Sequence, residues 1–441
     1  MTCRRAGSLV LLLLIWACQL GTARAQTLTL REAVLAAERN SPTAIIARER
    51  VAEAAAKSRQ AAALFYPTVR LTSSYSQSNN PVSVFMYALN QGKFELTPDL
   101  NDPAAADDWL VSGQVYFRLF SGGRDWANQR AAKAAERGFR SMQVSTDNEM
   151  TMQAIRSYLQ VLTATEYVHS AETSVKAYAS SEQVMASRVA AGTALKTELL
   201  NIQVQMARAE ERLLVAENGR ALAKEGLRLI MGLEELSYST FESLDSLALP
   251  EPSSATPVDR PEVLAHSAFA DAARAQLHAA KGSYLPTVNA FASLDRHQGW
   301  EYDGDKSTWA AGLSLEWTLF DGFSTSGTVR EKHANLRVAE EAARHVRLQT
   351  SVELRSATLS LAEATERVEV MERAATLAGE SSELTRQRFT QGLALSSHVI
   401  DAEDALVQAE FGLAQARADR LLAIATLRRA LAIPIIGDSQ S

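Results

Sequence analysis

The most constraining feature of the chain is an internal duplication that keeps its spacing while its residues differ. The segment Trp109–Gly123 returns as Trp309–Phe323, and Arg188–Leu195 returns as Arg388–Leu395. Both pairs have the same offset, so the stretch between the two segments has the same length in each copy. Spacing that is kept while residues drift indicates that the length itself is fixed by geometry.

The first residues, 1–25, are predicted to form a secretory signal peptide. Two arginines precede the apolar run Leu9–Trp16, and Ala23–Ala25 offers a small-residue cleavage site. The alternative is a lipoprotein signal with lipidation of Cys18, but the bulky Trp16 makes that a poor match, and cleavage after Ala25 is preferred. After the leader no run of about 20 apolar residues occurs, so no membrane-spanning helix is predicted.

The composition argues against several classes of function. The chain has 45 basic and 51 acidic side chains, and loss of the leader makes it more acidic, so nucleic acid is not an expected partner. Cys3 and Cys18 both lie in the leader, which excludes disulfides and thiolate metal sites from the mature chain. The seven histidines lack ligand-type spacing, and no phosphate-binding loop occurs. We therefore expect no catalytic, cofactor or metal site, and no enzyme.

Proline placement divides the chain into two similar halves. Prolines are absent between Pro103 and Pro250 and between Pro286 and Pro434. The composition of these spans predicts long helices over 123–231, interrupted at Gly192, and over 324–431, interrupted at Gly392.

Apolar and alanine positions recur along these helices at three- and four-residue spacing. Leu406, Ala409, Leu413 and Ala416 are one example. Such a stripe packs against a neighbouring helix, which the return limb after each glycine supplies. For the helices alone, an ordinary coiled-coil rod is an equally good interpretation.

Short alternating segments distinguish the two interpretations. In the segment Trp309–Leu319 one face is apolar and the other carries small and polar residues, and Trp109–Leu119 divides in the same way. Each is preceded by a candidate strand that begins with a proline, Pro67–Tyr75 and Pro286–Leu294. Strands of about 9–11 residues with one apolar face are typical of membrane β-barrels, although a half-buried soluble sheet has the same alternation.

The number of strands predicts an oligomer. Two hairpins supply four strands, and four strands leave open edges that lipid cannot satisfy. Known single-chain barrels begin at about eight strands, so closure needs several copies, and three copies give about twelve strands around a pore.

The predicted organisation follows from these elements. The predicted segments are a signal peptide (1–25), a first repeat (26–232) with a hairpin at 67–120 and long helices at 123–231, a linker or equatorial segment (233–258), a second repeat (259–433) with a hairpin at 286–320 and long helices at 324–431, and a C-terminal tail (434–441). Helix starts are predicted by the capping box of Thr29 and Glu32, by Ser41-Pro42 and by Asp259 to Pro261. The segment 79–108 is predicted to be a long outer loop, and 297–307 its shorter counterpart.

Over nearly the whole mature sequence the chain resembles the TolC-like outer-membrane efflux and secretion channels. The resemblance rests on the duplication, the proline-led strands, the Leu-Phe turns before Gly122 and Gly322, and the segment Arg388–Leu406. The family usually has a proline before that turn, where Arg118 and Thr318 stand here. The resemblance implies an α+β membrane protein, a homotrimer whose twelve-stranded outer-membrane β-barrel, four strands per protomer, continues as a long periplasmic α-helical barrel.

The resemblance also implies roles for two sets of residues. The helical tips would dock a periplasmic adaptor protein through Gly192, Thr193, Leu195, Gly392, Leu393 and Leu395. Just past the tips, the family closes its tunnel with acidic side chains, and the matching positions are Glu198, Asn201, His398 and Asp401. A histidine there would make closure sensitive to pH near neutrality. The alternatives are a plain helix–turn–helix and a solvated outer helix face.

The predicted function is that of a passive trimeric duct in the Gram-negative outer membrane, part of a tripartite efflux pump or a type I secretion system. It would receive substrates from an inner-membrane transporter and a periplasmic adaptor, contact outer-membrane lipid, and bind no cofactor. The alternative is a periplasmic coiled-coil structural or adaptor protein without a barrel. The sequence does not specify the cargo or the transporter.

Overall fold

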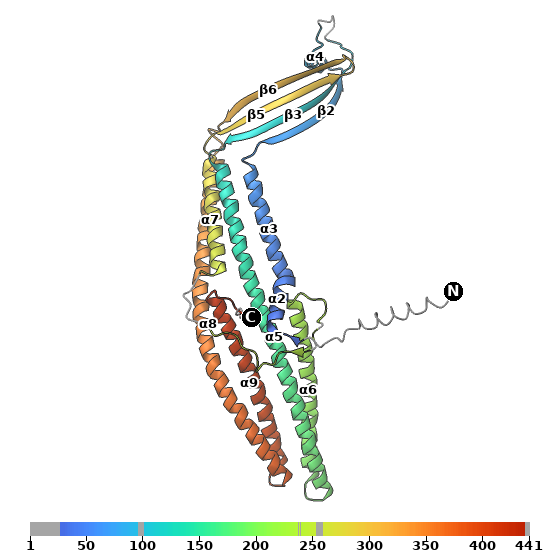
Figure 1. The fold of residues 1–441 in the computed structure, drawn as a ribbon, viewed down its shortest axis with the longest axis vertical. Coiled ribbons are helices and arrows are strands. Elements are labelled where there is room, and N and C mark those ends of the chain that lie inside the picture. The colour runs from blue at the N-terminus through green and yellow to red at the C-terminus, as the bar shows by residue number, and fades with distance from the viewer. Residues whose placement is uncertain (1–26, 96–100, 237, 239, 253–258, 437–441) are drawn as a thin grey trace, which may run out of the picture. The chain divides into compact units, whose positions relative to one another are not determined.

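A computed structural model describes residues 27–95, 101–236, 238, 240–252 and 259–436. The predicted signal peptide, with Cys18 and the cleavage site after Ala25, lies outside the described residues, as does the end of the C-terminal tail. Helices predominate, with one four-stranded sheet and one two-stranded sheet among the described residues (Figure 1). In chain order the elements are β1 Thr27–Leu28, α2 Leu30–Asn40, α3 Pro42–Ala63, β2 Thr68–Ser78, α4 Pro81–Asn90, β3 Ala106–Phe120, α5 Arg124–Ala190, α6 Lys196–Ile230, β4 Thr240–Phe241, α7 Pro261–Gly282, β5 Thr287–Gly299, β6 Gly304–Glu316, α8 Ser324–Thr390 and α9 Ser396–Ala430.

The chain forms two compact units, and the long helices α5 and α8 contribute to both. The first unit comprises residues up to 47, 143–260 and 349 onward; the second comprises 48–142 and 261–348. No helix in the described part of the chain is long and apolar enough to cross a membrane.

Equal helix lengths in the two repeats are the main regularity of the fold. Helices α5 and α8 each have 67 residues, and α6 and α9 each have 35. Proline-free, alanine-rich sequence accounts for helices this long, because neither a fixed φ nor a missing amide interrupts them. The turn after α5 and the turn after α8 therefore fall at equivalent places in the two copies.

The core of the first unit surrounds Tyr158, which is fully buried. Its hydroxyl donates to the Leu28 carbonyl at 2.7 Å, next to the place where β1 pairs in parallel with β4. Strand β4 lies in the segment 233–258, so part of the predicted linker is tied to the start of the described chain. The capping box predicted at Thr29 is confirmed, because the Thr29 hydroxyl accepts from the Glu32 amide at 3.2 Å and the Glu32 carboxylate accepts from the Thr29 amide at 3.0 Å.

The second unit contains the four-stranded antiparallel sheet, in the order β2–β3–β5–β6. Its register sorts the side chains into an apolar face and a polar face. One apolar row runs Leu71, Gly113, Leu294 and Trp309, and a neighbouring polar row runs Thr72, Ser112, Asp295 and Thr308. On the apolar face Leu71 is 75% exposed and Trp309 is 78% exposed, which is unusual for large apolar side chains of a water-soluble sheet.

Two predictions about the loops between strands are wrong. The predicted long loop at 79–108 contains helix α4 and the beginning of β3. Pro81 begins this helix instead of breaking it, because proline at the first helical position loses no hydrogen bond, and the Asn80 side chain caps the amides of Val82 and Ser83. The predicted loop at 297–307 is shorter, since β5 continues to Gly299 and β6 begins at Gly304.

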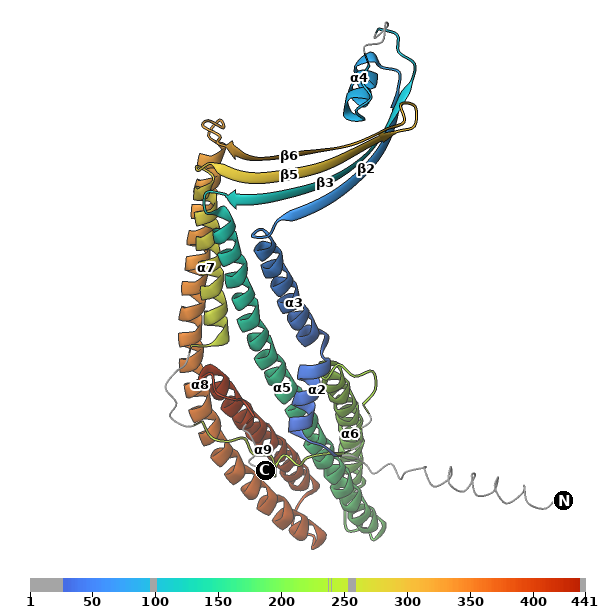
Figure 2. The same ribbon diagram turned by 45° about the horizontal axis from the view of Figure 1, so that its top comes forward.

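Helix α4 lies on one side of the sheet, within the concave side of its curve (Figure 2). This is the polar face, because the hydroxyl of Tyr87 donates to Ser76 at 3.0 Å and Gln91 contacts Asp108. The register places Ser76, Asp108 and His297 on the same side of the sheet as Thr72 and Ser112. The apolar face lies on the other side.

Candidate functional site

The two helical tips are built alike around a glycine in the left-handed region. Gly192 has φ +71° and Gly392 has φ +84°. At the first tip the Thr193 amide donates to the Arg188 carbonyl at 2.9 Å, and at the second the Leu393 amide donates to the Arg388 carbonyl at 2.8 Å. These bonds close the last turn of α5 and of α8, and a residue with a side chain would strain that turn.

Exposed leucines follow each glycine. Leu195 is 69% exposed, Leu393 74% and Leu395 56%. Leu195 and Leu395 occupy the N-cap positions of α6 and α9 and provide no side-chain cap, so each helix begins with amides that no cap side chain satisfies. The tips therefore combine exposed apolar side chains with helix starts that lack a side-chain cap, a combination that suits a protein partner.

Arg188 connects the first tip to the second. Its Nη2 atom donates to the Phe389 carbonyl at 2.6 Å and to the Thr390 carbonyl at 3.2 Å, and its guanidinium lies 5.3 Å from the centre of the Phe389 ring. Side chains from all four helices form a small core beneath this contact: Met185, Ile202, Phe389 and Val399. The two turns thus form one packed structure.

The candidate gate residues lie just above the tips, on α6 and α9. His398 and Asp401 are exposed and, being three residues apart, share a helix face, whereas Val399 between them is buried. In the first repeat Glu198 is half-buried and Asn201 is exposed. The structure brings His398 and Asp401 to one exposed face of α9.

Two acids near the tips, the buried Glu403 and the partly exposed Asp404, are residues that the sequence did not single out. Glu403 is 2% exposed, accepts from the Ser382 hydroxyl at 2.7 Å and lies 3.2 Å from the Arg386 guanidinium. Asp404 accepts from Arg212 at 2.9 Å and from the Tyr178 hydroxyl at 3.3 Å. Asp401, Glu403 and Asp404 are too close in sequence for composition to reveal which is buried.

Tyr178, Arg212 and Asp404 join α5, α6 and α9 in one polar contact. Burial, and secondly the negative charge of Asp404, raise the pKa of the Tyr178 hydroxyl well above its ordinary value. Burial alone would lower the pKa of the Arg212 guanidinium, but its hydrogen bond to Asp404 and the charge of Asp404 outweigh burial and raise it. These contacts hold α5, α6 and α9 together above the tip.

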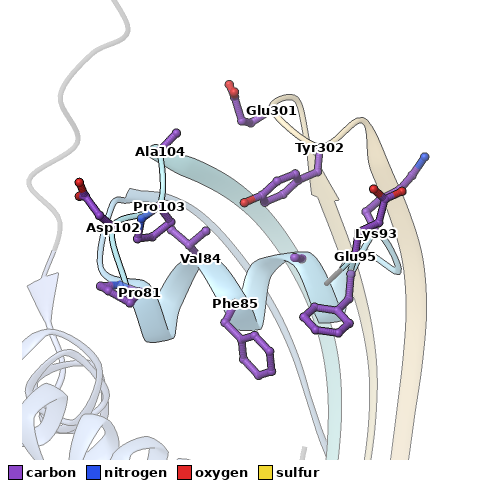
Figure 3. A pocket seen from close by; sticks show the side chains of 12 residues that line it. Pro81, Val84, Phe85, Lys93, Glu95, Asp102, Pro103, Ala104, Glu301 and Tyr302 are labelled. Atoms are coloured by element: carbon purple, nitrogen blue, oxygen red, sulfur yellow. The ribbon is translucent and has the colours of Figure 1, made fainter. Parts of the chain in front are cut away.

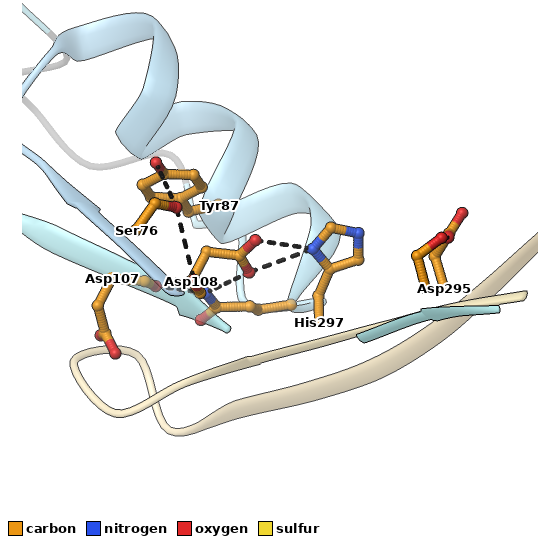
Figure 4. Close-up of polar contacts among 8 residues, drawn as sticks. Ser76, Tyr87, Asp107, Asp108, Asp295 and His297 are labelled. Atoms are coloured by element: carbon orange, nitrogen blue, oxygen red, sulfur yellow. Dashed lines mark hydrogen bonds and ion pairs between the residues drawn. The ribbon is translucent and has the colours of Figure 1, made fainter. Parts of the chain in front are cut away.

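A second candidate region lies at the β5–β6 turn of the sheet (Figure 4). Gln91 is 1% exposed and donates to the Asp107 carbonyl at 2.6 Å and to the Asp108 carboxylate at 3.1 Å. The same carboxylate lies 2.9 Å from Nδ1 of His297, and both side chains are nearly buried. The Asp107 carboxylate accepts from the backbone amides of Trp300 and Glu301 and so fixes the turn between β5 and β6.

This cluster was not predicted, although its components were visible in the sequence. His297 belongs to the polar face of its strand, as Asp108 does, but pairing them requires the register between β3 and β5. A cavity of about 550 Å³ adjoins the cluster between α4 and the turn (Figure 3). Its lining includes the rings of Phe85, Phe94 and Tyr302, with Lys93 and the acids Glu95, Asp102 and Glu301.

The comparison with protein families decides the broad identity of the chain. A family model described as outer membrane efflux protein matches residues 20–233 and 254–432, which include both repeats. The chain belongs to the outer membrane efflux protein family. The resemblance to TolC-like channels drawn from the sequence is confirmed, and this family is one of channels and not of enzymes.

Several characterised members of the family are similar to this chain. Protein CyaE of Bordetella pertussis is 23% identical over 345 residues, which cover 76% of this chain and 69% of CyaE. The outer membrane protein VceC of Vibrio cholerae superposes with a TM-score of 0.74 at 18% identity, over 92% of this chain and 96% of VceC. The open state of the MtrE outer membrane channel of Neisseria gonorrhoeae gives a TM-score of 0.76 at 15% identity, over 93% of this chain and 91% of MtrE. At these identities the structural likeness supports a shared fold.

Proposed function

We propose that the protein is a passive duct of the Gram-negative outer membrane, formed by three copies of this chain. Each copy contributes four strands to a twelve-stranded barrel, and the helices continue the pore through the periplasm. Family membership supports the channel function and an outer-membrane location. The domain division is part of the proposal: two repeats, each with one hairpin and one pair of long helices.

The two-faced sheet is the observation that carries this proposal. Its apolar face is exposed on an isolated chain, with Leu71, Leu294 and Trp309 each more than half exposed. Strands β2 and β6 are the outer strands of the sheet, and each has one edge without a partner strand among the described residues. Pairing β6 of one copy with β2 of the next satisfies these edges, places the apolar face in lipid and directs the polar face to the pore.

Partners are proposed on the same basis. An inner-membrane transporter would supply energy and cargo, and a periplasmic adaptor would dock on the tips through Gly192, Thr193, Leu195, Gly392, Leu393 and Leu395. The exposed leucines and uncapped helix starts support this assignment. The duct would serve a tripartite efflux pump or a type I secretion system, with specificity residing mostly in the transporter.

A gate is proposed just above the tips, formed by Glu198, Asn201, His398 and Asp401. Three copies of Asp401 around the axis would form a cation-attracting constriction. A histidine at this ring would make closure sensitive to pH near neutrality. Single-channel conductance of His398→Ala should therefore lose the pH dependence of the wild type, and an unchanged profile would contradict the role.

Cell fractionation distinguishes the duct from a periplasmic coiled-coil protein without a barrel. The duct predicts that the mature chain fractionates with the outer membrane, needs detergent for extraction and migrates as a heat-sensitive trimer. Recovery as a soluble periplasmic monomer would refute the proposal and favour the alternative.

A further inference from the structure

Helix α4 has two faces of different character. The side chains directed to the sheet are Val84, Tyr87, Ala88 and Gln91, of which Val84, Ala88 and Gln91 are buried. On the opposite face Val82 is 71% exposed, Met86 44% and Leu89 39%. The exposed three are spaced i, i+4 and i+7, so they form one apolar stripe that points away from the sheet.

Helix α4 rests on the sheet at Gly299 and Gly304, and this seat has no room for a larger residue at either position. A Cβ atom at Gly299 would lie 2.2 Å from Oε1 of Gln91, and one at Gly304 would lie 2.5 Å from Cβ of Gln91. Gln91 is also fixed by its hydrogen bonds to Asp107 and Asp108. The apolar stripe is therefore presented in a defined direction and does not belong to a loosely attached loop.

The polar face of the sheet decides what can cover this stripe. In the proposed barrel lipid contacts the opposite face, which carries Leu294 and Trp309, so the sheet itself would separate α4 from lipid. If the proposed barrel closes with its polar face inward, α4 of every copy lies inside the pore mouth with its apolar stripe toward the axis. The remaining neighbours at that position are the α4 helices of the other copies.

The dimensions of a twelve-stranded barrel would bring these helices close together. Strands spaced about 4.8 Å apart and tilted by about 40° close at a diameter of about 24 Å. Three helices of about 10 Å diameter, packed around one axis, occupy a circle of about 21 Å. Three copies of α4 would therefore occupy most of the mouth, with little space left between their inner faces.

We propose that the α4 helices of three copies meet through Val82, Met86 and Leu89 and form a constriction at the exit of the duct. The inference rests on the proposed trimeric duct and adds a second closure, at the strand mouth, to the one proposed near the tips. Each α4 is locked to its own sheet by Gln91, so passage of cargo requires α4 to leave its seat.

Site-directed disulfide formation tests this contact directly. The only cysteines are Cys3 and Cys18 in the predicted leader, so Met86→Cys gives a mature chain with a single thiol. Mild oxidation of outer membranes should convert most Met86→Cys chains to disulfide-linked dimers on a non-reducing gel. The matched control is Leu294→Cys, 61% exposed on the opposite face of the central strand β5, which should remain monomeric on the same gel.

The native oligomer of each variant, measured before oxidation, separates the two levels of the proposal. Trimers of Met86→Cys that cross-link, with a conductance that falls on oxidation and recovers on reduction, support the constriction. Trimers that stay uncross-linked, as in the control, overturn the constriction and leave the duct standing. A chain that forms no trimer in either variant overturns both. Val82→Cys, on the same stripe, replaces Met86→Cys if that variant does not fold.

Discussion

The two repeats have helices of identical length but different connections between their strands. Their long helices have 67 and 35 residues in both copies, and both tips turn at a glycine with positive φ. Their strand connections differ: residues 79–105 between β2 and β3 include helix α4, whereas residues 300–303 between β5 and β6 form a short turn. Helix length is thus the same in both repeats, whose tips contact each other. The length of the strand connection differs, and one repeat carries an additional helix there.

Even within the helical region the chemistry of equivalent contacts differs. Gln203 donates to Glu182 at 2.7 Å, and at the same places in the second repeat Ser382 donates to Glu403 at 2.7 Å. Glu403 is buried, whereas Gln203 is exposed. The hydrogen bond between the two long helices of each repeat is thus kept, although its donor, its acceptor and its burial differ. Geometry therefore constrains these positions more than residue type does.

Shortening one repeat should have the largest effect. Removal of Met371–Leu377 and Ala409–Gln415 retracts only the second tip, by about 10 Å. We expect this variant to lose the tip contact around Arg188 and all transport. Removal of Ala164–Ser170 and Ala216–Leu222 as well restores equal lengths, keeps the contact of Arg212 with Asp404, and should restore a trimer with normal conductance. Equal transport and equal conductance of the two variants would show that matched helix lengths are not required.

The seat of α4 is expected to be the next most sensitive place. Gly299→Ala forces a methyl group against Gln91 and should cost about 1–3 kcal/mol of local stability, as overpacking of a tight contact does. Limited proteolysis should then cut near α4 faster than in the wild type. Gly113→Ala is the control, since its Cβ would meet only the Leu294 carbonyl at 3.9 Å. Equal protease sensitivity of the two variants would contradict the assigned seat.

The glycines at the tips should respond unequally to alanine. Both positions have positive φ, so Gly192→Ala and Gly392→Ala should each lower the free energy of unfolding by about 1–2 kcal/mol. Gly392→Ala should be the more damaging, because its Cβ would lie 3.1 Å from Arg188, whereas Gly192 has open space. Gly219→Ala, within α6 and without close neighbours, should raise stability slightly. Denaturant unfolding of the three variants compares them, and equal losses at both tips would contradict the Arg188 contact.

The smallest expected effect concerns Tyr178, whose counterpart in the second repeat is Ala378. Its pKa is raised on folding, so its contribution to stability is complete below about pH 10 and is lost as the pH rises through the folded value. Tyr178→Phe should lose less stability than the wild type between neutral pH and pH above 10. Part of the loss should remain, because burial also raises the pKa of Tyr158. An identical alkaline profile for both proteins would contradict this assignment.

The sequence predicted those parts of the fold that depend on local signals. Proline-free composition predicted the long helices, the glycines marked the tips, and alternation predicted a two-faced hairpin in each repeat. It did not predict α4, because a proline within a segment between strands is typical of loops as well as of the first position of a helix. Nor did it predict the buried acid Glu403 or the pairing of Asp108 with His297, since burial and strand register depend on neighbours distant in sequence.

Native mass spectrometry of the mature protein, extracted from outer membranes in mild detergent, tests the central claim most directly. The four-stranded sheet of the described residues, in which β2 and β6 each have one edge without a partner strand, predicts an assembly of three copies. A stable species with three times the mass of one chain is the predicted result. A monomer, or an assembly with another number of copies, would contradict the closure of one barrel by three chains.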